Sequence, residues 1–141
     1  MIHQRQSLRF KCTACGKCCT GNEDHYIAMS KKEAKNIQTF LNITQRWFRR
    51  RYVKHLTRNI LTARMHKGRC VFLNKNNECL IYDLRPIQCR TYPYWPELLE
   101  TQKAWNNEAR HCEGINSGTI VPIKDITQKL ALQLKSEQDE L

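Results

Sequence analysis

The sequence predicts a small α+β protein with a cysteine-rich core, a β-hairpin and two to four helices. Helical periodicity runs through residues 30–41, 44–67 and 125–141, and two β-branched and aromatic runs flank an asparagine-rich loop within residues 70–82. Eight cysteines in 141 residues are far above average usage, so disulfides or metal ligands are expected in the core. The length fits a single domain, 1–141, that is large enough to bury a core of its own.

The cysteines divide into an amino-terminal group of four and four that follow singly. The first group lies in the run Cys12-Thr13-Ala14-Cys15-Gly16-Lys17-Cys18-Cys19, and the others are Cys70, Cys79, Cys89 and Cys112. The first three are each separated by two residues, a spacing at which one tight turn brings neighbouring thiolates to a common metal ion. Spacing therefore predicts a metal centre, with all eight cysteines as candidate ligands.

Compartment decides how clustered thiols are interpreted. Residues 1–10 are polar and basic and lack the apolar run of a signal peptide, and no stretch approaches the roughly 20 apolar residues of a membrane span. We therefore expect a cytoplasmic protein, in which clustered thiols bind metal. Four disulfides and redox-active thiols are the alternatives.

The formal net charge is +11, which makes this a strongly basic chain. Part of the excess surrounds the first cysteines (Arg5, Arg9, Lys11 and Lys17), and nine Lys or Arg with no acid lie within residues 46–69. Cations near a thiolate centre stabilise its negative charge. A solvated basic surface that serves solubility is the simpler explanation.

The first predicted helix begins at a capping box. Ser30 and Glu33 have the spacing at which each side chain accepts from the other residue's backbone N–H, and Ala34, Ile37 and Leu41 then share one face. A short strand is expected before it, within residues 24–29. Asn42 or Thr44 is expected to end this helix or to cap the next one.

A second, basic helix is expected over residues 44–67, which contain neither Gly nor Pro, with Gly68 as its stop. Phe48, Tyr52, Leu56 and Ile60 would form an apolar stripe, and Arg46, Arg50, Lys54 and Arg58 a cationic stripe on the opposite side. Like charges at this spacing repel, and Trp47 lies among them, so nucleic acid or another anionic partner is one hypothesis for this face. A solvated face is the alternative.

The segment Cys70-Val71-Phe72-Leu73 and the segment Glu78-Cys79-Leu80-Ile81-Tyr82 predict a β-hairpin around an Asn-rich loop. With Leu73 opposite Glu78, both cysteines of the hairpin would project from one face, as a shared metal site requires. After it we expect a turn at residues 83–86, a helix opened by Pro96 and a terminal helix at 125–141 that carries Ile126, Leu130 and Leu134.

The run from Phe10 to Cys19 resembles the YkgJ-type cysteine-cluster family, which is described as a zinc- or iron-chelating domain. The likeness continues through Cys70-Val71-Phe72-Leu73, Cys79-Leu80-Ile81-Tyr82, Arg85-Pro86, Cys89-Arg90, Tyr92-Pro93 and Cys112, and covers residues 10–118. Glu113 departs from the family, which commonly has proline there. The resemblance implies metal chelation through Cys12, Cys15, Cys18, Cys19, Cys70, Cys79, Cys89 and Cys112.

Thiol chemistry leaves the metal open, because zinc and iron both accept four thiolates. Eight thiolates suit two tetrahedral zinc sites, or one 4Fe-4S iron–sulfur cluster with four cysteines to spare. The alternatives to a metal-binding role are an iron–sulfur electron-transfer protein and a zinc-scaffolded nucleic-acid-binding module that uses residues 44–67. His25 and His111 lie near cysteines and are possible substitutes for a thiolate. No catalytic constellation stands out, so an enzyme is not expected.

Overall fold

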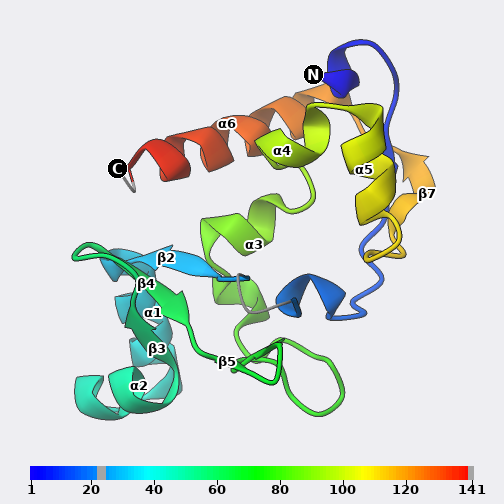
Figure 1. Ribbon diagram of the computed structural model, residues 1–141. Coiled ribbons are helices and arrows are strands. Elements are labelled where there is room, and N and C mark those ends of the chain that lie inside the picture. Colours follow the sequence, from blue (N-terminus) through cyan, green and yellow to red (C-terminus); the bar gives the residue numbers. More distant parts are fainter. Residues whose placement is uncertain (22–24, 140–141) are drawn as a thin grey trace.

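The computed structural model describes residues 1–21 and 25–139 and confirms the α+β class (Figure 1). Its first half contains η1 (Ile2–Gln4), β1 (Arg9–Phe10), η2 (Lys17–Cys19), β2 (Ala28–Ser30), α1 (Lys31–Leu41), α2 (Gln45–Arg51), β3 (Val53–His55), β4 (Ile60–Ala63), β5 (Met65–His66) and β6 (Arg69–Cys70). Its second half contains η3 (Tyr82–Leu84), α3 (Ile87–Thr91), α4 (Pro96–Leu99), α5 (Gln102–Glu108), β7 (Ile115–Ile120) and α6 (Ile123–Asp139).

The strands form three small antiparallel sheets. One has the order β2-β4-β3, another pairs β1 with β7, and the third pairs β5 with β6. The pairing of β1 with β7 places residues 9–10 beside residues 115–120, more than a hundred positions away. This pairing ties the start of the first cysteine run to the segment that follows Cys112.

Helix α1 begins and ends as its sequence predicts. Ser30 Oγ accepts from Glu33 N at 3.1 Å, and Glu33 Oε1 accepts from Ser30 N at 3.0 Å. Asn42 ends the helix in the left-handed conformation, and Thr44 caps α2 by accepting from Trp47 N at 3.2 Å. The expected strand before α1 is present at residues 28–30, while its predicted beginning at Asp24 lies outside the described residues.

The predicted helix over residues 44–67 is wrong beyond Arg51. Helix α2 ends there, and the chain continues as β3, a bend at 56–59 and β4. All four residues of β4 are buried, because β4 is the central strand between β2 and β3. Tertiary pairing of this strand outweighs the helical period of the sequence.

The cationic stripe is therefore not one helical face. Arg46 and Arg50 lie on α2, Lys54 lies on β3, and Arg58 lies in the bend. Gly68 is not a helix stop either: Lys67 and Gly68, with φ of 51° and 77°, form the two-residue turn between β5 and β6. The proposed nucleic-acid surface loses the regular spacing on which it was predicted.

The predicted hairpin of residues 70–82 is also wrong in its register. Leu73 lies opposite Cys79 in an isolated bridge, one residue away from the expected pairing with Glu78, and Cys70 pairs with Met65 instead. Asn74 explains the slip, since its Oδ1 accepts from Asn76 N at 2.8 Å and from Glu78 N at 3.0 Å and so fixes a tight loop. The two cysteines thus do not share one ladder.

Besides the expected helix at Pro96 and the terminal helix, the second half contains the short helices α3 and α5. Pro96 occupies the first turn of α4, as predicted. Helix α6 begins two residues before the predicted start, and it buries Ile126 and Leu130 while Leu134 is exposed. Among the described residues, no helix is both long enough and apolar enough to cross a membrane.

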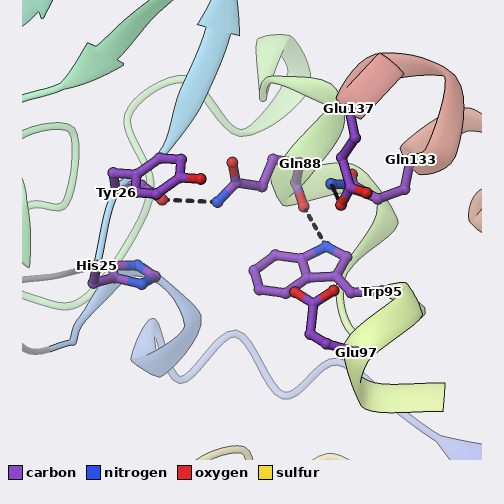
Figure 2. A pocket seen from close by; sticks show the side chains of 7 residues that line it. All are labelled: His25, Tyr26, Gln88, Trp95, Glu97, Gln133 and Glu137. Atoms are coloured by element: carbon purple, nitrogen blue, oxygen red, sulfur yellow. Dashed lines mark hydrogen bonds between the residues drawn. The ribbon is translucent and has the colours of Figure 1, made fainter. Parts of the chain in front are cut away.

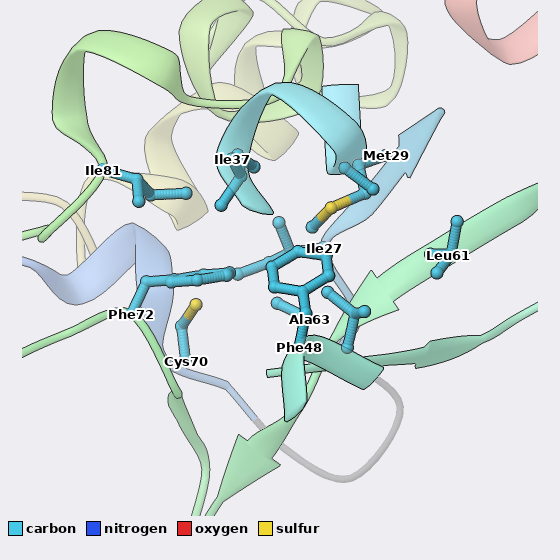
Figure 3. Close-up of a cluster of buried hydrophobic side chains, with 11 residues drawn as sticks. Ile27, Met29, Ile37, Phe48, Leu61, Ala63, Cys70, Phe72 and Ile81 are labelled. Atoms are coloured by element: carbon cyan, nitrogen blue, oxygen red, sulfur yellow. The ribbon is translucent and has the colours of Figure 1, made fainter. Parts of the chain in front are cut away.

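Buried side chains form two clusters. The helices and strands that supply them lie in two different parts of the ribbon (Figure 1). The first, which includes Phe48, Phe72 and Cys70, joins α1 and α2 to the three-stranded sheet (Figure 3). The second, which includes Trp105, packs α4, α5 and α6 with the β1–β7 pair. Helix α3 lies between them and packs on both α6 and β2, and the cysteines border both clusters.

Candidate metal centre

The amino-terminal cysteines lie on a tightly turned segment. Ala14 and Gly16 are both left-handed, with φ of 55° and 74°, and Gly16 caps η2, which carries Cys18 and Cys19. Before η2, Lys11 N donates to Gly114 O at 3.0 Å. These contacts fix where the first run begins and which way η2 leaves it.

Six of the eight cysteines line one pocket of about 240 Å³, here called the thiol pocket. Gly16, Tyr82, Arg85 and Tyr92 also contribute to its wall. Its cysteines are Cys12, Cys15, Cys18, Cys19, Cys79 and Cys112. The fold thus brings together thiols from the amino-terminal run, from the loop after β6 and from the segment before β7.

Cys70 and Cys89 do not line the thiol pocket, but the charges of two thiols that do line it act on both of them. Burial raises the pKa of the Cys70 thiol to about 11, and negative charge on Cys79 and Cys18 also raises it. Burial likewise raises the pKa of Cys89, with further contributions from Cys70, Cys18 and Cys79. Negative charge on Cys18 thus acts on Cys70, Cys79 and Cys89, and we call these four residues the inner thiols.

Cys112 lies in a different environment from the inner thiols. Burial raises its pKa, while hydrogen bonds from the backbone N–H groups of Gly114 and Ile115 lower it, and negative charge on Cys15 raises it again. The Tyr92 hydroxyl donates to Glu108 Oε1 at 2.6 Å. Cys15 and Cys112 thus interact with each other at the other side of the pocket.

Arg85 is the cation that acts on the inner thiols. Its charge lowers the pKa values of Cys18, Cys79 and Cys89, against the larger effect of burial on Cys79 and Cys89 and of the Cys19 hydrogen bond on Cys18. Arg85 also lines the thiol pocket, so its position places this charge near the sulfur atoms. A guanidinium here offsets part of the negative charge that thiolates would gather.

Comparison with known proteins agrees with this geometry. Residues 11–113 match the model of the CxxCxxCC family, described as a putative zinc- or iron-chelating domain. The chain belongs to the CxxCxxCC family. The match begins just before Cys12 and ends just after Cys112, so it contains every cysteine discussed above.

A curated relative supports the same assignment. The chain is 30% identical over 117 residues to uncharacterized protein MJ0661 of Methanocaldococcus jannaschii, an alignment that covers 79% of this chain and 60% of that protein. The chain therefore spans less than two thirds of this relative's length. No solved structure matches the chain.

The chemistry of the donors fits the metals named for the CxxCxxCC family. All eight cysteines are free thiols, and thiolates are preferred ligands of zinc and of iron–sulfur clusters. Among residues 1–21 and 25–139, however, no three His, Cys, Asp or Glu side chains are close enough to hold one ion.

A second, more open pocket adjoins the thiols in this CxxCxxCC protein. The pocket has a volume of about 360 Å³, and its wall includes Cys18, Tyr92, Glu108, His25 and His111. His111 Nε2 lies 2.6 Å from Lys17 O, a contact that holds the imidazole against η2. His25 and His111, the two histidines that the sequence suggested as possible ligands, thus both lie near Cys18.

Sequence reasoning missed the contact between Tyr92 and Glu108. Tyr92 is buried, and burial together with the Glu108 hydrogen bond raises its pKa. The two residues are sixteen positions apart and follow no motif, so no sequence signal points to the pair. Only the docking of α5 against the segment after α3 brings them together.

Proposed function

We propose that this chain binds zinc or iron through its cysteine thiolates, and that all eight cysteines serve as ligands. The observation that carries this proposal is the convergence of six free thiols, from three separated segments, on one pocket. Family membership supports it independently. A pocket lined by so many thiols has no evident role in packing alone.

The thiols suggest two centres. Negative charge on Cys18 and Cys79 raises the pKa values of Cys70 and Cys89, so these four thiols are one candidate ligand set that metal binding would draw together. Four thiolates complete a tetrahedral zinc site. The other four, Cys12, Cys15, Cys19 and Cys112, then provide a second site at the mouth of the thiol pocket.

Iron–sulfur chemistry is the second candidate, and the size of the thiol pocket favours it. A single zinc ion lies about 2.3 Å from each sulfur and leaves little free space between its ligands. A pocket of about 240 Å³ offers more room than one ion needs. A cluster there would make the protein an electron carrier, with Arg85 as a nearby positive charge that influences its potential.

A structural contribution accompanies either metal. A structural zinc site contributes about 10–16 kcal/mol in model peptides, which is comparable to the about 5–15 kcal/mol of net stability of a whole domain. Metal held by thiols from both hydrophobic clusters would tie the two clusters together. We therefore expect metal removal to loosen the fold.

Anaerobic isolation from cells supplied with both metals tests the proposal. Native mass spectrometry with elemental analysis should find zinc or iron bound, and a brown colour that bleaches on reduction would identify the iron–sulfur form. Cys18→Ser should lower the metal content, since Cys18 is an inner thiol. A folded, metal-free protein that gains no metal on reconstitution would overturn the proposal.

A further inference from the structure

A third pocket, separate from the thiol pocket, lies where α3, α4 and α6 meet the segment before β2 (Figure 2). It has a volume of about 190 Å³. Two carboxylates, two aromatic rings and three other polar side chains form its wall: Glu97, Glu137, Trp95, Tyr26, His25, Gln88 and Gln133. We call it the acidic pocket, and it contains none of the cysteines.

Hydrogen bonds hold one side of the acidic pocket in place. Trp95 Nε1 donates to Thr91 Oγ1 at 3.2 Å, and Thr91 Oγ1 donates to Gln133 Oε1 at 2.7 Å. Gln133 Nε2 then donates to Glu137 Oε1 at 3.1 Å. Because Thr91 and Gln133 are buried, this relay fixes the carboxylate of Glu137 and leaves its second oxygen for another partner.

Hydrogen bonds also hold the opposite side of the acidic pocket in place. Gln88 Nε2 donates to Tyr26 O at 2.8 Å, and Gln88 Oε1 accepts from Ala28 N at 3.0 Å, so α3 is fastened to the segment before β2. Beside them, His25 Nε2 is buried and has no hydrogen-bond partner among residues 1–21 and 25–139. Figure 2 shows His25 and Tyr26 across the pocket from Trp95 and Glu97.

The charge of the acidic pocket is opposite to that of the whole chain, which is +11. Glu97 is an exposed residue, but its partial burial raises its pKa, and the charges that raise it further belong to Glu137 and Glu108. Negative charge is thus concentrated at one place without an offsetting cation among the groups that act on Glu97. Such a place gains most from a bound cation.

We propose that the acidic pocket binds an alkylammonium group. An ammonium has three N–H donors, which match the carboxylates of Glu97 and Glu137, and its charge is attracted by the ring of Trp95. The volume accommodates the ammonium with a short alkyl chain. This site is independent of the metal that we propose for the thiols.

A metal ion is a poorer occupant of this pocket. Divalent cations prefer several charged oxygen ligands at short distance, and only two carboxylates, Glu97 and Glu137, line this pocket. An ammonium needs only hydrogen-bond distances and an aromatic neighbour. It can come from a free amine or from a lysine side chain, since both present the same group.

Titration of the protein with three probes of equal length tests the proposal. We expect butylammonium to bind saturably, with shifts of the Trp95 fluorescence or indole resonance, while butanol and butyrate do not. A lysine-containing peptide and free butylammonium then distinguish the two sources. Equal binding of butylammonium and butanol, or no saturable binding of butylammonium, would overturn it.

Variants locate the site. Glu97→Gln and Glu137→Gln should each weaken butylammonium binding about tenfold, the scale of one charge-assisted hydrogen bond. Glu100→Gln is the matched control, because Glu100 is exposed at the end of α4 and does not line the pocket. Thermal unfolding and metal content should be similar in all three variants, which separates lost binding from lost folding and from the metal proposal. Unchanged affinity in both pocket variants would refute the assignment.

Discussion

The guanidinium of Arg85 lies 3.9 Å from the centroid of the Tyr82 ring, and Arg85 Nε donates to Tyr82 O at 2.9 Å. These contacts fix a long, mobile side chain at the wall of the thiol pocket. Its charge there acts on Cys18, Cys79 and Cys89. Arg85 is therefore placed to stabilise thiolates rather than to pair with a carboxylate.

Replacing Arg85 should weaken metal binding. Arg85→Gln removes the positive charge beside the inner thiols, and we expect metal affinity to fall by about tenfold or more, as for other groups that support metal ligands. Competition with a chromophoric chelator measures this. Arg90→Gln is the control, since Arg90 is exposed on α3 next to Cys89 in sequence. Equal affinities of the two variants would contradict the role of Arg85.

Metal binding near neutral pH should release protons. The pKa values of Cys18, Cys70, Cys79, Cys89 and Cys112 are all raised, so these thiols are protonated in the metal-free protein at pH 7. Each must lose its proton to coordinate, and apparent affinity should rise up to about tenfold per pH unit for each proton released. Calorimetry in buffers of different ionisation enthalpy counts these protons. Heats that do not depend on the buffer would contradict this prediction.

The metal-free protein should become less stable in alkali. Burial raises the pKa of Cys70 from 9.0 to about 11, so the folded state holds this proton more tightly than the unfolded chain does. The resulting stability is fully present below pH 9 and is lost as the pH rises to about 11, by at most about 1.4 kcal/mol per pH unit for one thiol.

Urea unfolding at several pH values checks this, with and without the thiol. Cys70→Ala should flatten the decline, because the buried proton is gone. Cys12→Ala should keep it, since Cys12 is exposed. A decline that is identical in both variants would assign the effect to other groups.

Local signals explain what the sequence predicted correctly. The capping box of Ser30 and Glu33 and the proline at the start of α4 act within one turn of their own helix, so the sequence contains the whole interaction. The apolar stripe of Ile126 and Leu130 likewise defines the buried face of α6. These elements needed no knowledge of the rest of the fold.

Contacts between residues far apart in the chain explain what the sequence did not predict correctly. Leu56 continues the helical period of Phe48 and Tyr52, yet it is 43% exposed, because the chain turns there between β3 and β4. The burial of Ile60 depends on strand β2, thirty residues earlier, which no local pattern reveals. The hairpin register failed similarly, since the side chain of Asn74 sets the loop.

The candidate metal site was likewise only partly predictable from local sequence patterns. The spacing of the cysteines predicted a shared metal centre, which stays a prediction, while six of the thiols line one pocket. The division into inner thiols and a second set depends on how α3 and the loop after β6 meet, and spacing does not contain it. The acidic pocket has no sequence motif, since Glu97 and Glu137 lie forty positions apart.

Glu33 should stabilise the protein beyond its own helix. Besides capping α1, its Oε2 accepts from Ile87 N at 2.8 Å, at the start of the helix that carries Cys89. Glu33→Ala leaves two partly buried N–H groups without acceptors, which should cost about 2 kcal/mol in the free energy of unfolding. Urea unfolding measures it against Lys32→Ala, an exposed change on the same turn. A cost within a few tenths of the control would show that the bridge to α3 is dispensable.

Gly16 should link backbone conformation to metal binding. Its φ of 74° is left-handed, and a Cβ there would lie 2.8 Å from Asn77 O and 3.2 Å from Leu73 Cδ1. Gly16→Ala should thus cost about 1–2 kcal/mol in stability for the backbone alone, and more for the contact with Asn77 O. Because Gly16 caps η2, the same change should displace Cys18 and Cys19 and lower metal affinity.

Gly118→Ala separates the two effects. Gly118 is also left-handed, with φ of 79°, but its nearest neighbour is the side chain of Lys11 and it does not line the thiol pocket. Both variants should lose stability to urea, because both place a Cβ in the left-handed region. Only Gly16→Ala should lose metal in chelator competition. Equal metal affinity in the two variants would mean that the turn at Gly16 does not position the thiols of η2.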